Sequence, residues 1–140
     1  MDIRDEHDGA HALSWAQCME LVATRGVGRI AFTDAALPQV LPVNFALDGT
    51  SIVFRTASEG RLAATCRGTV VAFEVDFFNL DFHSGWSVLI IGGADAIVNE
   101  GDLLRARQLP FAPWPGGHRD HFVRIVPGIV TGRMLSALAV

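Results

Sequence analysis

The feature that most constrains the fold is a pair of alternating apolar segments joined by Asp48-Gly49. Apolar residues in 41–47 and in 51–56 recur with the period of two that places side chains on opposite faces of a strand. An Asp-Gly pair between two such segments is a strong signal for a β-hairpin. The segment therefore predicts two antiparallel strands with one apolar face.

The register of this hairpin decides which side chains share its other face. With the Asp-Gly pair as the loop, Asn44 is expected to oppose Val53, and Pro42 to oppose Arg55. Proline cannot donate a backbone hydrogen bond, so Pro42 predicts an edge or a gap in the sheet. An amide and a guanidinium gathered near such a gap suit a polar ligand.

Other segments continue the strand pattern. Strands are predicted at residues 28–33, 71–77, 86–98, 122–126 and 129–131. Gly92-Gly93 predicts a bulge or bend, and Pro127-Gly128 predicts a turn or bulge. The strands do not alternate regularly with helices, so the sequence predicts a mainly β fold, a six-stranded antiparallel split barrel with a few short helices.

Three short helices are expected between the strands. Ser14 and Gln17 form a capping-box pattern ahead of apolar residues at helical spacing. Ser58 is a candidate N-cap of a second helix, and residues 102–109 read as a third. We expect a single domain at 14–133, with a polar N-terminal tail at 1–13 and a C-terminal tail at 134–140.

Composition excludes several classes of protein. Hydrophobic residues make up 50% of the 140 residues, yet no uncharged run approaches the roughly 18 residues of a membrane span. The apolar excess therefore indicates a subunit interface.

The net charge is −4, and all eleven basic residues are arginine, which argues against a broad surface for nucleic acid. The acidic start does not resemble a secretory signal, so we expect a cytoplasmic protein with reduced thiols at Cys18 and Cys66.

A polar cluster follows the hairpin. Arg55 and Thr56 precede the predicted start of the Ser58 helix, and Arg61 lies one turn further along. Two guanidiniums, two hydroxyls and a helix N-terminus together predict a cradle for a phosphate group. The alternative is that both arginines are solvated charges at the barrel rim and that Ser58 only caps a helix.

Six segments carry a resemblance to a known family: LPVNFALDG, IVFRTASEGRLA, VAFEVD, GWSVLIIGGA, PW and HFVRIVPGIVTGR. In this order they resemble the pyridoxamine 5′-phosphate oxidase-like flavin-binding split barrels, from about Ser14 to Arg133. The resemblance implies a homodimer of split barrels with a flavin, usually FMN, in each of two clefts at the subunit interface. It also implies a flavin-dependent oxidoreductase that acts on a small molecule.

The resemblance also assigns the cofactor site. The strand from Pro42 to Phe45 would lie along the isoalloxazine ring, Arg55, Thr56 and Arg61 would hold the phosphate, and Trp86, Ser87 and Trp114 would close the cleft. The predicted cofactor-binding residues are thus Pro42, Val43, Asn44, Phe45, Arg55, Thr56, Ser58, Arg61, Leu62, Trp86, Ser87 and Trp114. No catalytic side chain is assigned, because the flavin carries the chemistry.

Membership of this family does not fix the identity of the cofactor. Many relatives have lysine where this chain has Arg61, and FAD or a deazaflavin are alternatives to FMN. A haem would need an axial ligand, for which His83 is a weak candidate. The alternative function is a non-catalytic carrier or sensor of flavin, deazaflavin or haem.

Two further clusters are candidate sites. His7 and His11 have the helical spacing of a metal-binding pair, but no third ligand is evident, so we expect a solvated tail and no metal. Glu74 and Asp76 share a strand face and could form an acid-base pair. Ion pairing with Arg29 or Arg124 is the favoured interpretation for them.

Overall fold

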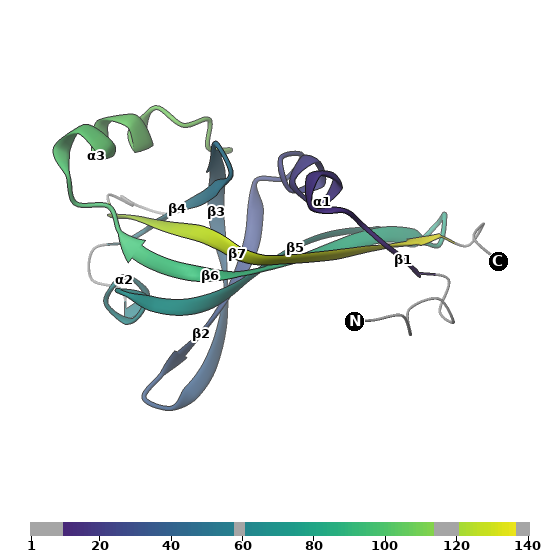
Figure 1. The fold of residues 1–140 in the computed structure, drawn as a ribbon, viewed down its shortest axis with the longest axis horizontal. Helices are drawn as coiled ribbons and strands as arrows, with labels where there is room; N and C mark the ends of the chain where they lie inside the picture. The colour runs from purple at the N-terminus through teal and green to yellow at the C-terminus, as the bar shows by residue number, and fades with distance from the viewer. Residues whose placement is uncertain (1–9, 58–60, 114–120, 137–140) are drawn as a thin grey trace.

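A computed structural model describes residues 10–57, 61–113 and 121–136 of the chain (Figure 1). Its elements in chain order are β1 (Ala10–Ala12), α1 (Trp15–Val22), β2 (Val27–Asp34), β3 (Leu37–Asp48), β4 (Ser51–Thr56), α2 (Arg61–Thr65), β5 (Thr69–Asn79), β6 (Ser84–Ala96), α3 (Glu100–Arg107) and β7 (His121–Ser136).

The strands form one antiparallel sheet in the order β1-β7-β4-β3-β2-β5-β6, and β6 also pairs with β7. This last pairing closes six strands into a ring, which confirms the mainly β split-barrel class. The strand count of six was too low, because the described residues form seven strands. The extra strand is β1, which pairs with the end of β7 through Ala10 and Leu135.

The sheet extends beyond the expected domain limits of 14–133 at both ends. Strand β1 lies within the segment expected to be a polar tail, and β7 continues to Ser136. Each strand supplies backbone partners to the other, since Ala12 opposes Arg133 and Ala10 opposes Leu135. Backbone pairing thus orders a strand of only three residues, which is too short to be predicted from alternation.

Most of the core lies inside the barrel. Phe45 and Phe73 meet there edge to face, with ring centroids 5.1 Å apart. Helix α1 covers one opening with Cys18 and Val22, both buried. Its predicted capping box is confirmed, because Ser14 and Gln17 exchange hydrogen bonds of 2.8 and 3.1 Å. A second, smaller cluster lies beneath α3 and includes Val53, Ala106 and Phe122.

Helix α3 covers the outer side of the sheet near β4 (Figure 1). It begins after the N-cap Asn99, whose side chain accepts a hydrogen bond from the Asp102 amide at 3.2 Å. The helix is tied to the hairpin by Arg105, which lies 2.6 Å from Asp48. This contact places the segment that follows α3 near the hairpin strands.

The irregularities of the long strands fall at the predicted glycines. Ile91 opposes Ile129 and Gly92 opposes Pro127, so Gly128 is the extra residue of a bulge. The residues expected to form two strands, 122–126 and 129–131, therefore form one bulged strand, β7.

The predicted hairpin register was wrong by two residues. Asp48 opposes Ser51, so the loop consists of Gly49 and Thr50, and Gly49 has a φ of +64° that suits glycine. Val53 consequently opposes Ala46 instead of Asn44. A shift of two residues keeps every side chain on its predicted face, so Asn44 and Arg55 still share the polar face of the hairpin.

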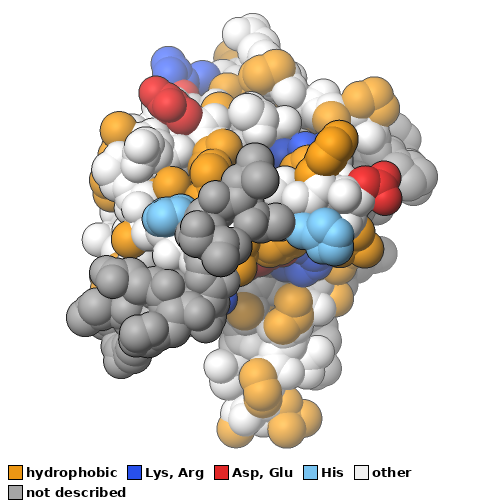
Figure 2. Space-filling model, turned by 90° about the vertical axis from the view of Figure 1, so that its right-hand side faces the viewer, with side chains coloured by type: hydrophobic (Ala, Val, Ile, Leu, Met, Phe, Trp, Pro, Cys, Tyr) orange, Lys and Arg blue, Asp and Glu red, His pale blue; other side chains and the backbone are white. Residues whose placement is uncertain are grey.

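Apolar side chains are also exposed. The β2–β3 hairpin projects from the barrel, and hydrophobic groups cover much of it (Figures 1 and 2). Leu37 and Val40 on this hairpin are 62% and 61% exposed, and Leu80 and Phe82 at the β5–β6 turn are 84% and 73% exposed.

The predicted thiols of Cys18 and Cys66 are buried and unbridged. None of the helices in the described ranges has the length and apolar character needed to cross a membrane.

Candidate functional site

Asn44 and Arg55 form the centre of the polar face predicted for the hairpin. The Oδ1 atom of Asn44 accepts hydrogen bonds from Arg55 Nε at 3.2 Å and from Nη2 at 2.5 Å. The Asn44 amide in turn donates to the carbonyl of Gly26 at 3.1 Å. Only 1% of Asn44 is exposed, so it needs these partners to be buried without a large cost.

Phe111 covers the Arg55 guanidinium from the other side. The guanidinium carbon of Arg55 lies 4.5 Å from the centre of the Phe111 ring, within the range of a cation-π contact. Phe111 also packs on Phe122, with ring centroids 6.0 Å apart. The contact between Phe111 and Arg55 was not predicted from the sequence. The arginine is therefore held in one orientation by an amide and an aromatic ring.

The described part of this cluster leaves one edge of Arg55 available. Its Nη1 atom has no hydrogen-bond partner within residues 10–57, 61–113 and 121–136. The predicted neighbours Ser58 and Trp114 lie outside those residues. Arg61 is the first residue of α2, and its side chain is also not described. The proposed phosphate contacts of these three residues remain predictions.

Several predicted site residues contribute their side chains to the protein interior. Val43, Phe45, Leu62 and Trp86 all belong to the core inside the barrel. Thr56 is buried and opposes His121 at the start of β7. Pro42 is exposed and opposes Arg29. The core residues can therefore shape a site from behind, while the faces that bear Asn44 and Arg55 offer polar groups.

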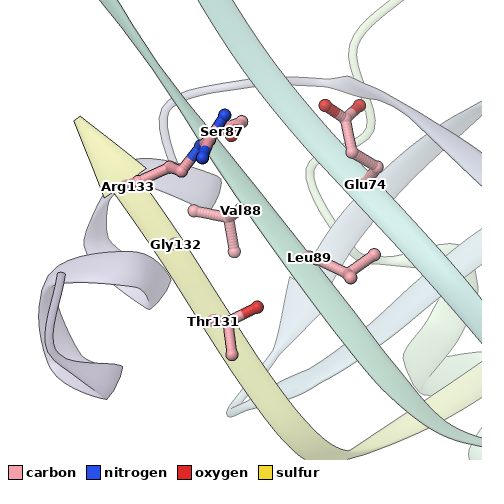
Figure 3. Close-up of a pocket in the computed structure, with 7 residues that line it drawn as sticks. All are labelled: Glu74, Ser87, Val88, Leu89, Thr131, Gly132 and Arg133. Carbon is pink, nitrogen blue, oxygen red and sulfur yellow. The ribbon is translucent and has the colours of Figure 1, made fainter. Parts of the chain in front are cut away.

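Ser87 lies in a separate pocket on the outer face of β5, β6 and β7. This pocket has a volume of about 250 Å³ and is lined by Glu74, Ser87, Val88, Leu89, Thr131, Gly132 and Arg133 (Figure 3). Strand alternation creates it, because Val88 and Ile90 point into the core while Ser87 and Leu89 point outward. The structure thus divides the predicted site residues between two places.

The Glu74 wall of this pocket carries an unusual carboxyl group. The pKa of Glu74 is raised to about 7, first by burial and also by the neighbouring carboxyl group of Asp76. Arg29 Nη1 lies 3.5 Å from both carboxyl groups and opposes this rise. The predicted ion pairing with Arg29 is confirmed. Arg124 instead lies 3.0 Å from Asp48.

Only one of the two histidines considered as metal ligands lies in the described part of the chain. His11 lies on β1, so the helical spacing invoked for His7 and His11 does not apply to it, and His7 lies outside the described residues. No group of three or more His, Cys, Asp or Glu side chains placed to hold a metal ion occurs within residues 10–57, 61–113 and 121–136. His83, the weak haem-ligand candidate, lies in the β5–β6 turn with a φ of +50°.

Comparison with known proteins gives consistent results. The sequence model of the pyridoxamine 5′-phosphate oxidase family matches residues 14–134. The uncharacterized protein Rv0080 of Mycobacterium tuberculosis is 34% identical over 121 residues, which cover 83% of this chain and 79% of that protein.

Solved structures share the fold. An FAD-binding protein from Mycobacterium smegmatis is 30% identical, with a TM-score of 0.76 over 89% of this chain and 97% of the other. A Corynebacterium glutamicum structure described as a pyridoxamine 5′-phosphate oxidase is 26% identical, with a TM-score of 0.78 over 97% of each chain. The matching residues include both β3–β4 and the GWSV segment of β6. The chain therefore belongs to the pyridoxamine 5′-phosphate oxidase family.

Proposed function

We propose that this protein is a flavin-dependent oxidoreductase that binds FMN and acts on a small molecule. The observation that carries the proposal is the oriented Arg55 guanidinium, which is held by Asn44 and Phe111 and has an Nη1 atom without a partner in the described chain. Family membership and the similarity to an FAD-binding protein support a flavin as the ligand.

Within the described part of the chain, the residues near Arg55 are chemically suited to the phosphate group of a flavin. A planar guanidinium recognises phosphate oxygens through its N–H groups, and fixing its orientation beforehand lowers the entropy lost on binding. Asn44 is a neutral side chain, so it orients Arg55 without neutralising its charge. A carboxylate in the same place would compete with phosphate for that charge.

Each predicted residue then has a role. Arg55 binds the phosphate, together with Arg61 and the hydroxyl groups of Thr56 and Ser58. Pro42, Val43, Asn44 and Phe45 hold the ring along β3, with Leu62 behind the cradle. Trp86, Ser87 and Trp114 bound the cleft. The bound flavin would supply hydride or electron transfer, and the protein orients it and excludes water from it.

We also propose that the protein functions as a homodimer in the cytoplasm. The exposed side chains of Leu37, Val40, Leu80 and Phe82 form apolar surface that a second copy can bury. Sedimentation velocity tests this directly. A dimer at micromolar concentration is the expected result, and a monomer at every concentration would contradict the assembly.

The cofactor is tested on the protein as isolated. We expect a yellow protein whose visible absorbance is bleached by a reduced nicotinamide and restored by an added acceptor. Mass spectrometry of the released cofactor distinguishes FMN from FAD or a deazaflavin. A coloured protein without turnover supports the carrier alternative, and a colourless protein that binds none of the three cofactors refutes both functions.

The phosphate cradle is tested by the double variant Arg55→Ala/Arg61→Ala. We expect flavin affinity to fall by at least about 10-fold, because two charge-assisted contacts are lost. The single variant Arg107→Ala is the control, because it removes an exposed charge from the last turn of α3. Unchanged affinity in a folded double variant would refute the proposed phosphate contacts.

A further inference from the structure

The last turn of α3 is attached to the β3–β4 hairpin by one arginine. Arg105 Nε lies 3.0 Å from Asp48 Oδ1 and 3.2 Å from Oδ2, and Arg105 Nη2 lies 2.6 Å from Oδ1. Two nitrogens of one guanidinium therefore hold one carboxylate, a geometry that orders both side chains. Arg124 on β7 lies 3.0 Å from the same carboxylate, so Asp48 is itself fixed to the barrel.

Helix α3 has few other contacts that could hold it in place. Among its eight residues, all of which are described, Ala106 is the one that is buried. Ala106 belongs to the small apolar cluster that also contains Val53 of β4 and Phe122 of β7. A helix of this length is marginally stable by itself, so its position depends on tertiary contacts. Loss of the Arg105 contact should therefore loosen the end of α3.

A short path of backbone contacts leads from this end of the helix to the Arg55 cluster. Three hydrogen bonds span it, from the amides of Gln108, Leu109 and Phe111 to the carbonyls of Arg105, Ala106 and Leu109, at 3.1, 3.2 and 2.8 Å. The Phe111 ring then lies 4.5 Å from the Arg55 guanidinium carbon. These contacts restrict how far Phe111 can move relative to α3.

Both ends of this path meet the same face of the sheet. Val53 and Arg55 alternate with buried residues along β4 and so point to one side of it, and they oppose Arg124 and Phe122 on β7. Asp48 contacts Arg124 on that side. Helix α3 and the residues that follow it therefore cover a continuous strip of the outer face from Asp48 to Arg55.

We propose that Arg105 is a positioning residue for anion binding at Arg55. Through Asp48 it holds α3 in place, and α3 in turn holds Phe111 over the Arg55 guanidinium. The inference rests on the proposed flavin function, in which the anion is the phosphate group, and it adds a residue outside the predicted site. A guanidinium that is oriented before the phosphate arrives loses less entropy on binding.

Arg107 provides a matched control for Arg105. Both arginines are exposed and lie in the last turn of α3. Arg107 makes no hydrogen bond or ion pair with any residue in the described part of the chain. Arg105→Ala and Arg107→Ala therefore remove the same charge from the same turn, but only Arg105→Ala removes a contact with Asp48. Asp48 keeps Arg124 as its partner in both variants, so the barrel should stay folded.

The first test measures flavin affinity by titrating cofactor-free protein with FMN and following the quenching of FMN fluorescence. We expect Arg105→Ala to weaken binding about 2- to 5-fold, because Arg55 loses its aromatic cover. Arg107→Ala should match the native protein. Arg105→Lys, which keeps the charge but not the two-nitrogen contact, should fall between the native protein and Arg105→Ala. Equal affinities for the two alanine variants would overturn the inference.

The second test asks whether the effect of Arg105 passes through Phe111. In the Phe111→Leu background the ring that Arg105 positions is already absent, so adding Arg105→Ala should not lower FMN affinity further. A general effect on folding or on charge would instead give the same loss in both backgrounds. An undiminished loss in the double variant would therefore overturn the inference.

The third test needs no cofactor. Hydrogen exchange of the Phe111 amide, which is bonded to the Leu109 carbonyl, should be about 3-fold faster or more in Arg105→Ala than in Arg107→Ala or the native protein. Equal exchange in all three proteins would show that α3 stays in place without Arg105, and would overturn the inference.

The outcomes also separate this inference from the function on which it rests. Native protein that binds FMN, together with an Arg105→Ala variant that behaves like Arg107→Ala in all three tests, would overturn the role of Arg105 alone. Native protein that binds no flavin would overturn the proposed function and, with it, any role of Arg105 in flavin binding.

Discussion

The side-chain oxygen of Asn44 accepts two hydrogen bonds from Arg55 while its amide nitrogen donates to the Gly26 carbonyl. The donation to Gly26 fixes which end of the amide faces Arg55, since a carbonyl oxygen can only accept. Gly26 also accepts a hydrogen bond from the Phe45 backbone at 3.0 Å. The start of β2, the middle of β3 and the end of β4 are thus joined at one buried amide.

Replacing Asn44 with alanine tests this junction. We expect Asn44→Ala to lower the free energy of unfolding by about 1–3 kcal/mol, because buried polar groups lose their partners. Flavin affinity should also fall, because Arg55 loses the contact that orients it. Chemical denaturation and flavin titration measure the two effects. A double-mutant cycle with Arg55→Ala should show coupling, and strictly additive losses would contradict the interaction.

The polar junction could be predicted in part from the sequence. Alternation alone placed Asn44 and Arg55 on one face of the hairpin, and this held although the loop was assigned to the wrong two residues. The error moved each pairing by two positions, which preserves faces but changes neighbours. Thr50 gives no strong turn signal of its own, so the sequence did not distinguish the Asp48-Gly49 loop from the Gly49-Thr50 loop.

Replacing Phe111 tests its cation-π contact with Arg55. We expect Phe111→Leu to keep the apolar packing on Phe122 but to lose the cation-π contact, which contributes about 0.5–1 kcal/mol at exposed sites. Flavin affinity should fall about 2- to 5-fold, with little loss of stability. Phe111→Tyr, which keeps an aromatic face, is the matched control, and an equal loss of affinity in both variants would argue against the cation-π explanation.

The contact of Phe111 with Arg55 and the β6 pocket could not be predicted from sequence spacing. Phe111 reaches Arg55 because α3 and the residues after it cover the outer side of β4, an arrangement set by tertiary packing. Glu74 on β5 shares this pocket with Thr131 on β7, a strand that is distant in the chain. By contrast, the pairing of Glu74 and Asp76 with Arg29 was predictable in kind, because two acids on one strand face need a cation.

Asp48 is expected to stabilise the fold in a pH-dependent way. Its side chain is only 9% exposed, and hydrogen bonds from Arg105 and Arg124 hold its pKa below the ordinary value of 3.8. The folded state therefore binds fewer protons than the unfolded state, and this stabilisation is present above pH 3.8 and is lost as the pH falls through the lowered pKa.

Asp48→Asn should therefore be less stable than the native protein at pH 7, and the difference should shrink below pH 4. Urea denaturation at several pH values measures it. Asp95→Asn removes an exposed carboxyl group on β6 and is the control. A stability difference that stays constant from pH 7 to pH 3 would show that the ion pairs of Asp48 contribute nothing through its charge.

Glu74 should have the opposite effect on stability, and this can be measured without any cofactor. Its pKa is raised from 4.5 to about 7, so the folded state binds more protons than the unfolded state between these values. The native protein should lose stability as the pH rises from 4.5 to 7, and Glu74→Gln should not share that loss. The stability of Glu74→Gln relative to native should thus rise across this window and level off above it. Asp81→Asn should follow the native curve throughout, and parallel curves for native and Glu74→Gln proteins would mean that Glu74 titrates normally in the folded state.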